Sequence, residues 1–384
     1  MNSPRLQRDR LTLFSYLMTA AYVWGLYGLG PALLLLRDET GMTRTVSSLH
    51  SSAIATGVFL VGVVGAAITH RLGRGRTITL GSAGAALGIC LIAFGGAPNV
   101  SIPGAFVLGF GGSLLLNGVA SFLTEHHGAL GANAIGEQNG IGVTAGLLAP
   151  MALGVFVSAG LNWRFALMLG PVLFLLARTL RGPSAALDIG LEDRSIAGGR
   201  LPAAYWWAWG TLTLCIGVEF SFVMWAGDVL RDQSEASVSL AAASLTAVAG
   251  GMAAGRFLIG TLLRRISIEH VFVASLLLPL VMWLPMWLSH SSTVILLAMV
   301  SIGFGLGFHY PLCFARMLAA SDGFTDRAAA RSSLASGLAI GLAPLGLGAL
   351  ADHVGLHVAF TAVPTMLAAA VALTLARPIR ATVR

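Results

Sequence analysis

Long apolar runs separated by short polar gaps fill the sequence from end to end. A helix needs about 20 residues, at 1.5 Å of rise each, to cross roughly 30 Å of hydrocarbon. The pattern therefore predicts an all-α polytopic membrane protein with twelve transmembrane helices. The predicted spans are residues 11–36, 46–69, 77–96, 102–123, 134–159, 165–180, 205–229, 238–263, 271–288, 294–318, 332–351 and 358–376.

The two halves of the chain repeat each other at an offset of 194 residues. Arg, Asp and Pro are scarce in this sequence, so their coincidence at one offset carries more weight than apolar matches do. The order of the matches predicts two pseudo-symmetric six-helix bundles, related by an axis along the membrane normal. We expect them to span residues 1–180 and 205–384, joined by a polar linker of residues 181–204. The matching segments are Leu36-Arg37-Asp38 with Leu230-Arg231-Asp232, Arg71 with Arg265, Gly109-Phe110-Gly111 with Gly303-Phe304-Gly305, and Ala149-Pro150 with Ala343-Pro344.

Composition narrows the class of protein further. Only 10% of residues are charged and the mean hydropathy is +0.82, whereas about 25% of an ordinary soluble domain is charged. All 23 basic residues are Arg, which excludes a P-loop lysine and Schiff-base chemistry. Three scattered cysteines form no disulfide framework or CxxC pair. We expect no cofactor, no metal and no nucleic-acid partner.

The arginines also predict an orientation. Nineteen of them lie at the helix ends on the side of the N-terminus, and four, Arg37, Arg44, Arg164 and Arg231, lie on the other side. Basic residues accumulate in cytoplasmic loops of membrane proteins. We therefore expect a multi-pass protein integral to the plasma (inner) membrane, with both termini and the linker in the cytoplasm.

Two six-span halves around a polar linker resemble the major facilitator superfamily. Residues 66–76 read A-A-I-T-H-R-L-G-R-G-R, similar to the family's signature G-x-L-a-D-R-x-G-R-[RK] between spans 2 and 3, with Ala66 at the Gly and His70 at the Asp. The resemblance implies a monomeric secondary carrier that moves a small solute by alternating access within membrane lipid. It also implies an inner-gate loop at His70, Arg71, Arg74, Arg76, Arg264 and Arg265.

Two shorter patterns bear on the direction of transport and on the solute. Residues 142–154 follow G-x3-G-x3-P-x3-G, which resembles the span-5 motif of the family's exporters, with Ala149 where their Gly precedes Pro. This resemblance implies efflux. Residues 217–219 read G-V-E, similar to the span-7 pattern of fucose-type sugar porters. The alternative is therefore proton-coupled import of a sugar-like solute.

Glu219 is the strongest candidate for chemistry, because it lies within span 7 far from any other charge. A carboxyl at that depth is costly unless it pairs, is hydrated or binds a proton, and such residues are usually functional. We predict that Glu219 couples transport to protons, with His309 of span 10 as its partner. The resemblance implies that spans 1, 4, 7 and 10 line the cavity. The predicted solute-binding residues are Tyr22, Trp24, Tyr27, Asn117, Glu219, His309 and Tyr310.

A membrane-embedded enzyme acting on lipid is the alternative from another class. Glu125, His126 and His127 are its only candidate residues. Adjacent histidines point to different sides of a helix, which disfavours a metal site. We therefore expect a transporter and no enzymatic activity.

Overall fold

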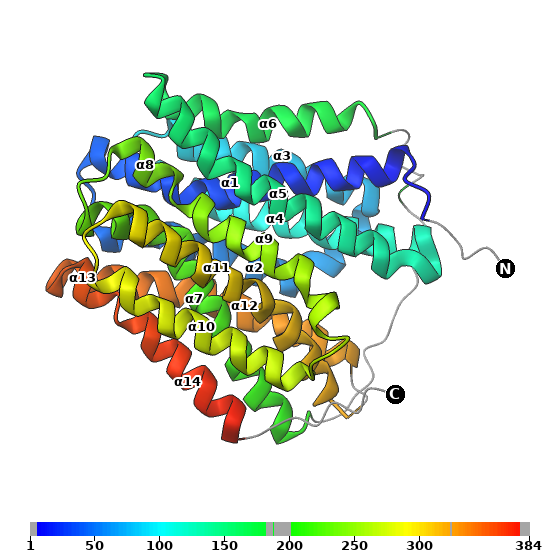
Figure 1. Ribbon diagram of the computed structural model, residues 1–384. Coiled ribbons are helices and arrows are strands. Elements are labelled where there is room, and N and C mark those ends of the chain that lie inside the picture. The colour runs from blue at the N-terminus through cyan, green and yellow to red at the C-terminus, as the bar shows by residue number, and fades with distance from the viewer. Residues whose placement is uncertain (1–5, 182–186, 188–200, 323–324, 377–384) are drawn as a thin grey trace.

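The computed structural model describes residues 6–181, 187, 201–322 and 325–376, and these residues are almost entirely helical (Figure 1). A short 3₁₀ turn, Gly128–Leu130, leads into α5. The α-helices are α1 Arg10–Thr40, α2 Arg44–Leu72, α3 Arg74–Phe94, α4 Pro98–His127, α5 Gly131–Ser158, α6 Trp163–Arg178, α7 Ala203–Gln233, α8 Val238–Ala243, α9 Leu245–Leu262, α10 Ile268–Leu288, α11 Ser292–Ala319, α12 Thr325–Val354, α13 Leu356–Ala359 and α14 Ala362–Ala376.

The helices correspond to the predicted spans. Eleven segments in the described part of the chain are long and apolar enough to cross a membrane. In this set α8 and α9 together make one span, as do α13 and α14. The remaining helix, α6, is 16 residues long and is the shortest of the twelve predicted spans. The break between α8 and α9 falls at Ser244, whose hydroxyl donates 2.7 Å to the carbonyl of Ala241.

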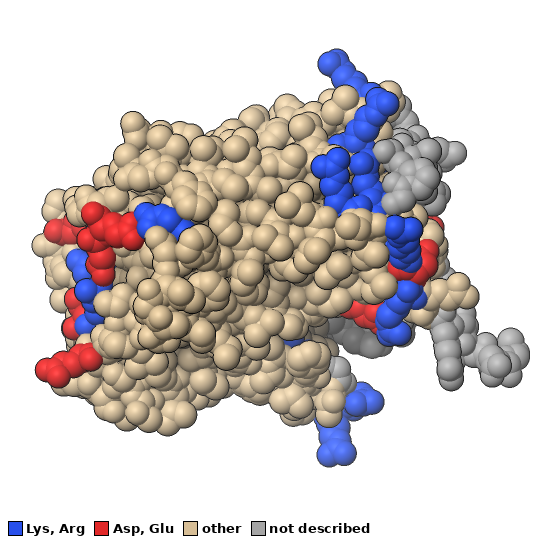
Figure 2. Space-filling model, turned by 90° about the horizontal axis from the view of Figure 1, so that it is seen from above, with Lys and Arg blue, Asp and Glu red and all other residues tan. Residues whose placement is uncertain are grey.

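The molecule has two ends, which we call the terminal end and the distal end. The terminal end carries the start of α1 and the end of α14, and the distal end carries the α1–α2 connection and α13. In Figure 2 charged side chains gather at these two ends and a broad uncharged belt lies between them. That distribution suits a protein whose middle is surrounded by hydrocarbon.

The helices form two pseudo-symmetric bundles, α1–α6 and α7–α14, as the repeat predicts. In the first bundle α4 presses Gly109 against α2, where a methyl group would lie 2.3 Å from the Ile54 carbonyl oxygen. In the second bundle α11 presses Gly303 against α9, where a methyl group would lie 2.1 Å from the Val248 carbonyl oxygen. Gly303 and Val248 of the second contact lie 194 positions after Gly109 and Ile54 of the first contact, respectively. The scarce-residue matches therefore reflect an equivalent packing of helices in the two bundles.

The bundles meet along α1 with α7, α2 with α12, and α5 with α8 and α9. The seam between α2 and α12 widens along its length. Near the distal end a methyl group at Gly348 would lie 2.8 Å from the Ser48 hydroxyl. Farther along, a methyl at Gly341 would lie 3.0 Å from Cβ of Ala55, and at Gly337 its nearest neighbour would be 3.9 Å away. The two helices are thus in contact distally and part towards the terminal end.

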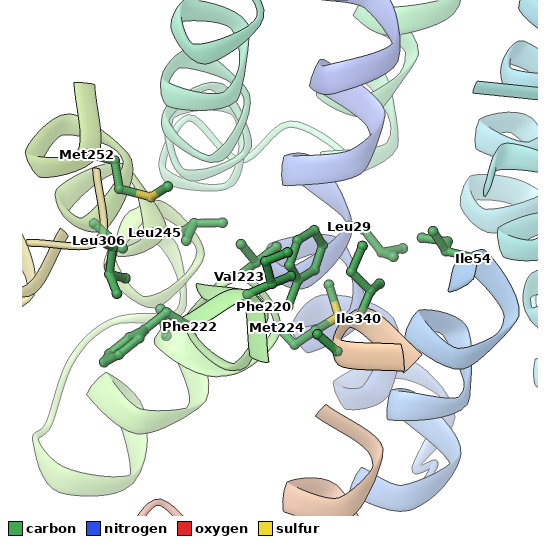
Figure 3. Close-up of a cluster of buried hydrophobic side chains, with 14 of the residues drawn as sticks. Leu29, Ile54, Phe220, Phe222, Val223, Met224, Leu245, Met252, Leu306 and Ile340 are labelled. Carbon is green, nitrogen blue, oxygen red and sulfur yellow. The ribbon is translucent and has the colours of Figure 1, made fainter. Parts of the chain in front are cut away.

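An apolar layer closes the centre of the interface. Figure 3 shows Leu29 of α1 beside Phe220, Val223 and Met224 of α7 and Ile340 of α12. Each of these side chains is at most 9% exposed. Burial of this size from both bundles supplies hydrophobic stabilisation in the same way as a protein core.

Candidate functional site: a cavity between the two bundles

A cavity of about 360 Å³ lies between the bundles on the terminal side of this apolar layer. Phe220 and Ile340 belong both to the layer and to the cavity wall, so the cavity ends where the layer begins. The described residues of its wall are Thr19, Val23, Tyr27, Leu116, Asn139, Gly142, Val143, Ile216, Glu219, Phe220, Arg256, Tyr310, Pro311, Ser336 and Ile340. An apolar wall with a few converging polar groups is the usual character of a small-molecule site.

Glu219 projects into this cavity from α7 and is 7% exposed. Its carboxylate oxygen accepts a hydrogen bond of 2.7 Å from the hydroxyl of Tyr27 on α1. That bond joins the two bundles. Glu219 and Tyr27 thus line the same cavity, and their roles in binding solute and protons stay predictions.

Arg256 of α9 lines the same cavity and brings a positive charge to it. The Tyr27 hydroxyl interacts electrostatically with both Arg256 and Glu219. Within the described part of the chain, no cation lies within 4.0 Å of the Glu219 carboxylate. A carboxylate, a guanidinium and a phenol between them can thus hold a polar solute or a proton.

Tyr310 completes the polar wall from α11, with 41% of its side chain exposed. The neighbouring His309 points the other way. It is 1% exposed, and its Nε2 lies 3.0 Å from the Ser275 carbonyl oxygen on α10. His309 therefore lies inside the second bundle and not among the described residues of the cavity wall, although its ring interacts electrostatically with Glu219.

Three more of the predicted binding residues lie away from the cavity. Tyr22 is buried against Gly112 of α4, where its ring fills the space that a side chain would need. The indole of Trp24 donates 3.0 Å to the Ala166 carbonyl of α6. Asn117 is exposed on α4, one residue past Leu116 of the cavity wall. The sequence indicates how far along its helix each of these residues lies, but it does not resolve which face of the helix the residue occupies.

The cavity face of α1 does follow a sequence rule. Thr19, Val23 and Tyr27 are spaced four residues apart, so they lie along one helix face. Asn139 of α5 and Arg256 of α9 were missed for different reasons. Asn139 lies at the start of a predicted span, and Arg256 lies near the end of its span, where an arginine can extend to the membrane surface without taking part in transport. Thr19 could have been found from the sequence, because it lies on the same face of α1 as the predicted binding residue Tyr27.

The predicted inner-gate residues lie at the terminal end. Arg74 follows the single connecting residue Gly73 and is 3% exposed. It forms two hydrogen bonds with Glu125 of α4, at 2.8 and 3.1 Å. The other five predicted residues are exposed: His70, Arg71, Arg76, Arg264 and Arg265. Among the described residues, the predicted inner-gate residues thus form one ion pair, between Arg74 and Glu125, and both partners belong to the first bundle.

The residues of the enzyme alternative are each held by a separate partner. His126 pairs with Asp9 at 2.7 Å, and His127 lies 2.8 Å from the Thr12 hydroxyl. Glu125 binds Arg74, as described above. Among the described residues no group of three His, Cys, Asp or Glu side chains has the arrangement of a metal site.

The distal end carries a cluster of ion pairs between the bundles, which sequence reasoning missed. Arg37 of α1 pairs with Asp228 of α7, and Arg231 pairs with Asp38. Arg44 of α2 lies 3.7 Å from Asp232. The two repeated Arg-Asp segments, cited above only for their symmetry, thus face each other. They surround a polar hollow of about 400 Å³.

A second distal contact reinforces this cluster. Asp352 near the end of α12 accepts hydrogen bonds from the backbone N–H groups of Arg44 and Thr45, at 3.0 and 2.8 Å. Those N–H groups belong to the first turn of α2, where a carboxylate is favoured by the helix dipole. The α2–α12 seam is therefore tied at its distal end.

Comparison with known proteins gives a consistent result. The family model of the Major Facilitator Superfamily matches residues 15–318. A bacterial homolog of the human lysosomal transporter Spinster, inward-facing and occupied, superposes with a TM-score of 0.77 at 15% identity over 97% of each chain. A D-xylose-proton symporter superposes with a TM-score of 0.73 at 13% identity, covering 96% of this chain and 97% of the other.

The nucleoside transporter NupG gives a similar value, with a TM-score of 0.73 at 13% identity over 96% of this chain and 97% of the other. No curated protein sequence is significantly similar to this chain. Identities this low establish the fold alone, whereas the family model covers most of the chain. Twelve predicted spans, two equivalent bundles, a cavity between them and the family match lead to one conclusion: the chain belongs to the Major Facilitator Superfamily, whose members transport solutes across membranes.

Proposed function

We propose that this protein is a secondary active carrier that moves a small organic solute by alternating access and couples the movement to protons through Glu219. One observation carries the proposal: the Glu219 carboxyl of one bundle accepts a hydrogen bond from Tyr27 of the other, inside the cavity between them. Rocking of the bundles must make and break this bond.

The surroundings of Glu219 support a role in proton binding. A carboxyl of low exposure at this depth is stable when it is protonated, hydrogen-bonded or near a cation. Tyr27 and Arg256 provide the second and third of these conditions in the present arrangement. Separation of Tyr27 from Glu219 removes one stabilising donor, and proton binding then becomes more favourable. Proton uptake and bundle movement would be linked in this way.

We further propose that the terminal end faces the cytoplasm of the cell, with the arginine bias as the support. The state described here is then inward-facing, because the distal ion pairs and the apolar layer lie on the outer side of the cavity. Two similar structures, both of a bacterial homolog of Spinster, are also inward-facing.

Efflux is the proposed direction of transport, and the Gly/Pro pattern of α5 supports it. Its last glycine, Gly154, packs on α8 of the other bundle, where a methyl group would lie 2.6 Å from Cβ of Ala243. Gly146 packs within its own bundle, where a methyl group would lie 3.2 Å from the ring of Tyr27 on α1. The distal end of the pattern, at Gly154, therefore lies on the surface where the two bundles meet.

Import of a polyhydroxylated solute is the second candidate, favoured by the polar groups of the cavity. Glu219, Tyr310, Asn139 and Ser336 offer hydrogen-bond donors and acceptors from four helices. D-Xylose and uridine are suitable first probes, since similar folds include a xylose symporter and a nucleoside transporter. A thermal-shift screen that extends from these two to other solutes identifies the ligand, because binding to the folded state raises the apparent stability.

Glu219→Gln tests the proton-coupling proposal, because it keeps the shape and the hydrogen-bond acceptor but cannot titrate. In proteoliposomes we expect this variant to lose solute movement driven by a pH gradient while exchange between compartments of equal pH continues. Glu137→Gln is the matched control, since Glu137 pairs with Arg8 at the terminal end, outside the cavity. Unchanged pH-driven accumulation in Glu219→Gln would show that the coupling lies elsewhere.

A further inference from the structure

A second hollow, separate from the solute cavity, opens on the outer surface of the seam between α2 and α12. It has a volume of about 570 Å³, within the range of ligand pockets. Its walls are almost entirely apolar, and several of them are strongly exposed, including Phe59 at 51% and Leu342 at 61%. We call this hollow the seam groove.

The seam groove has little capacity for a polar ligand. Among the described residues of its wall, two carry hydroxyls, and both hydroxyls are already used within the protein. Ser52 donates 2.7 Å to the Gly341 carbonyl, and Thr56 donates 2.8 Å to the Ser52 carbonyl. The part of an occupant that enters the groove must therefore be apolar.

The origin of the groove is the divergence of α2 from α12 described above. Gly337 has no side chain. A methyl group added there would still lie 3.9 Å from its nearest neighbour across the seam, the Ala55 carbonyl oxygen. The groove therefore exists because the bundles part at this point and because a glycine forms part of its wall. It would shrink if the two helices came together at this end.

A cation and two tryptophans stand at the terminal mouth of the groove. Trp206 and Trp209 line the groove from the first turns of α7. The guanidinium of Arg331 stacks 5.3 Å from the ring centre of Trp206, and its backbone carbonyl accepts 3.0 Å from the Trp209 indole. No described carboxylate forms an ion pair with Arg331. Tryptophan and arginine at the end of a membrane helix favour the headgroup region of a bilayer.

We propose that the seam groove binds an anionic phospholipid, with one acyl chain in the groove and the phosphate at Arg331. An apolar slot that opens to hydrocarbon selects the chain, and a guanidinium at the membrane surface selects the negative headgroup. The lipid then fills the space between the parted bundles. It stabilises the arrangement in which the terminal end is open, because closure of the seam requires the chain to leave.

Purified full-length protein in detergent provides the test, with dioleoyl phosphatidylglycerol and dioleoyl phosphatidylcholine as the two lipid probes. Native mass spectrometry measures lipid binding and thermal unfolding measures stabilisation. We expect phosphatidylglycerol to bind more tightly than phosphatidylcholine. Arg331→Gln should weaken phosphatidylglycerol binding about fivefold, the size of one arginine–headgroup attraction. It should leave phosphatidylcholine binding unchanged.

Gly337→Leu tests the acyl part separately, because it fills the groove and leaves Arg331 in place; it should weaken binding of both lipids. Arg178→Gln is the matched control, since Arg178 is an exposed arginine at the terminal end of α6, away from the seam. Inorganic phosphate should give no stabilisation. The proposal is overturned if Arg178→Gln weakens binding as much as Arg331→Gln does, if neither groove variant changes binding, or if phosphate alone stabilises as well as phosphatidylglycerol.

Discussion

The distal and terminal ends of the molecule differ in how their charges are paired. At the distal end, three ion pairs connect one bundle to the other. At the terminal end, the described ion pairs each stay within one bundle, as in Arg74 with Glu125 and Arg316 with Glu269. Ion pairs across an interface must break when that interface opens, whereas pairs within a bundle move with it. The comparison indicates that the distal end is closed and that the terminal end is free to part.

The backbones of the two bundles also pack more tightly at the distal end than at the terminal end. On α1, Gly30 touches α7 so closely that a methyl group would lie 1.9 Å from the Val223 carbonyl oxygen. On α5, Gly136 near the terminal end has nothing within 4 Å of that position. The distal interface is therefore packed backbone to backbone, and no corresponding contact exists at Gly136.

Gly30→Ala should have the largest effect on this difference. The added methyl cannot fit beside the Val223 carbonyl, so the distal interface must separate or distort. Overpacking of a buried site costs about 1–3 kcal/mol. We expect a lower thermal stability, severely reduced transport and increased modification of a cysteine introduced at the distal end.

Two alanine variants isolate the effect on the interface. Gly136→Ala adds the same group where space is available and should leave all three properties near native. Gly251→Ala creates a similar clash, 2.0 Å from the Val300 carbonyl oxygen, but inside the second bundle. It should lower stability without raising distal accessibility. Equal distal accessibility in Gly30→Ala and Gly251→Ala would contradict the account.

Asp228→Asn should have the next largest effect. The Asp228 side chain is 4% exposed and that of Arg37 is 14% exposed, so neutralising one leaves the other charge nearly buried. Removing one partner of a buried pair costs about 3–5 kcal/mol, and the part-exposed arginine places this case at the low end or below. Distal opening relieves the penalty by hydrating Arg37. The exchange of charges in Arg37→Asp with Asp228→Arg is the control, and partial recovery of distal protection would distinguish pairing from simple misfolding.

Arg231→Gln should have a much smaller effect. Arg231 and Asp38 are 40% and 38% exposed, and exposed pairs contribute about 0–1 kcal/mol. A distal accessibility change as large as that of Asp228→Asn would show that the exposed pair, and not the buried one, holds the interface. High salt should weaken the contribution of Arg231 more than that of Asp228, because water and ions screen exposed charges more effectively.

Asp9→Ala, at the terminal end, should alter stability without altering the balance between the ends. Asp9 caps α1 through a 2.8 Å bond from the Thr12 N–H, and loss of such a cap costs about 1 kcal/mol. Partial burial raises the pKa of Asp9, but the bonds from Thr12 and His126 outweigh it and lower the net pKa. The cap contribution is therefore complete above the ordinary carboxyl pKa and is lost as pH falls through the lowered value. Thermal unfolding of native protein and variant should converge at acid pH.

The sequence predicted those features that depend on spacing along one chain. The twelve spans follow from the length of apolar runs, and the pseudo-symmetry follows from scarce residues such as Arg71 and Arg265 at one offset. The depth of Glu219 was also readable, since it is a single charge inside a span. Each of these predictions uses residues close in sequence or a single repeated interval.

The features that sequence did not reveal depend on which helix faces meet. Trp24 and Tyr27 lie at neighbouring depths, yet one bonds α6 and the other bonds Glu219. Their spacing of three residues directs the two side chains about 60° apart around the helix, which is enough for them to meet different helices. Arg37 and Asp228 are 191 residues apart, and nothing local to either indicates its partner. Helix rotation and bundle contact are tertiary properties that apolar run length does not encode.

The most direct test measures both ends at once. Pulsed electron spin resonance gives the distance between spin labels in a background whose three native cysteines are replaced by alanine. Labels at Leu161 and Glu235 report the distal end, and labels at Thr124 and Arg265 report the terminal end. We predict that Asp228→Asn lengthens the distal distance and shortens the terminal distance relative to the native pairs. Lengthening at the distal end with an unchanged or longer terminal distance would contradict reciprocal movement of the two bundles.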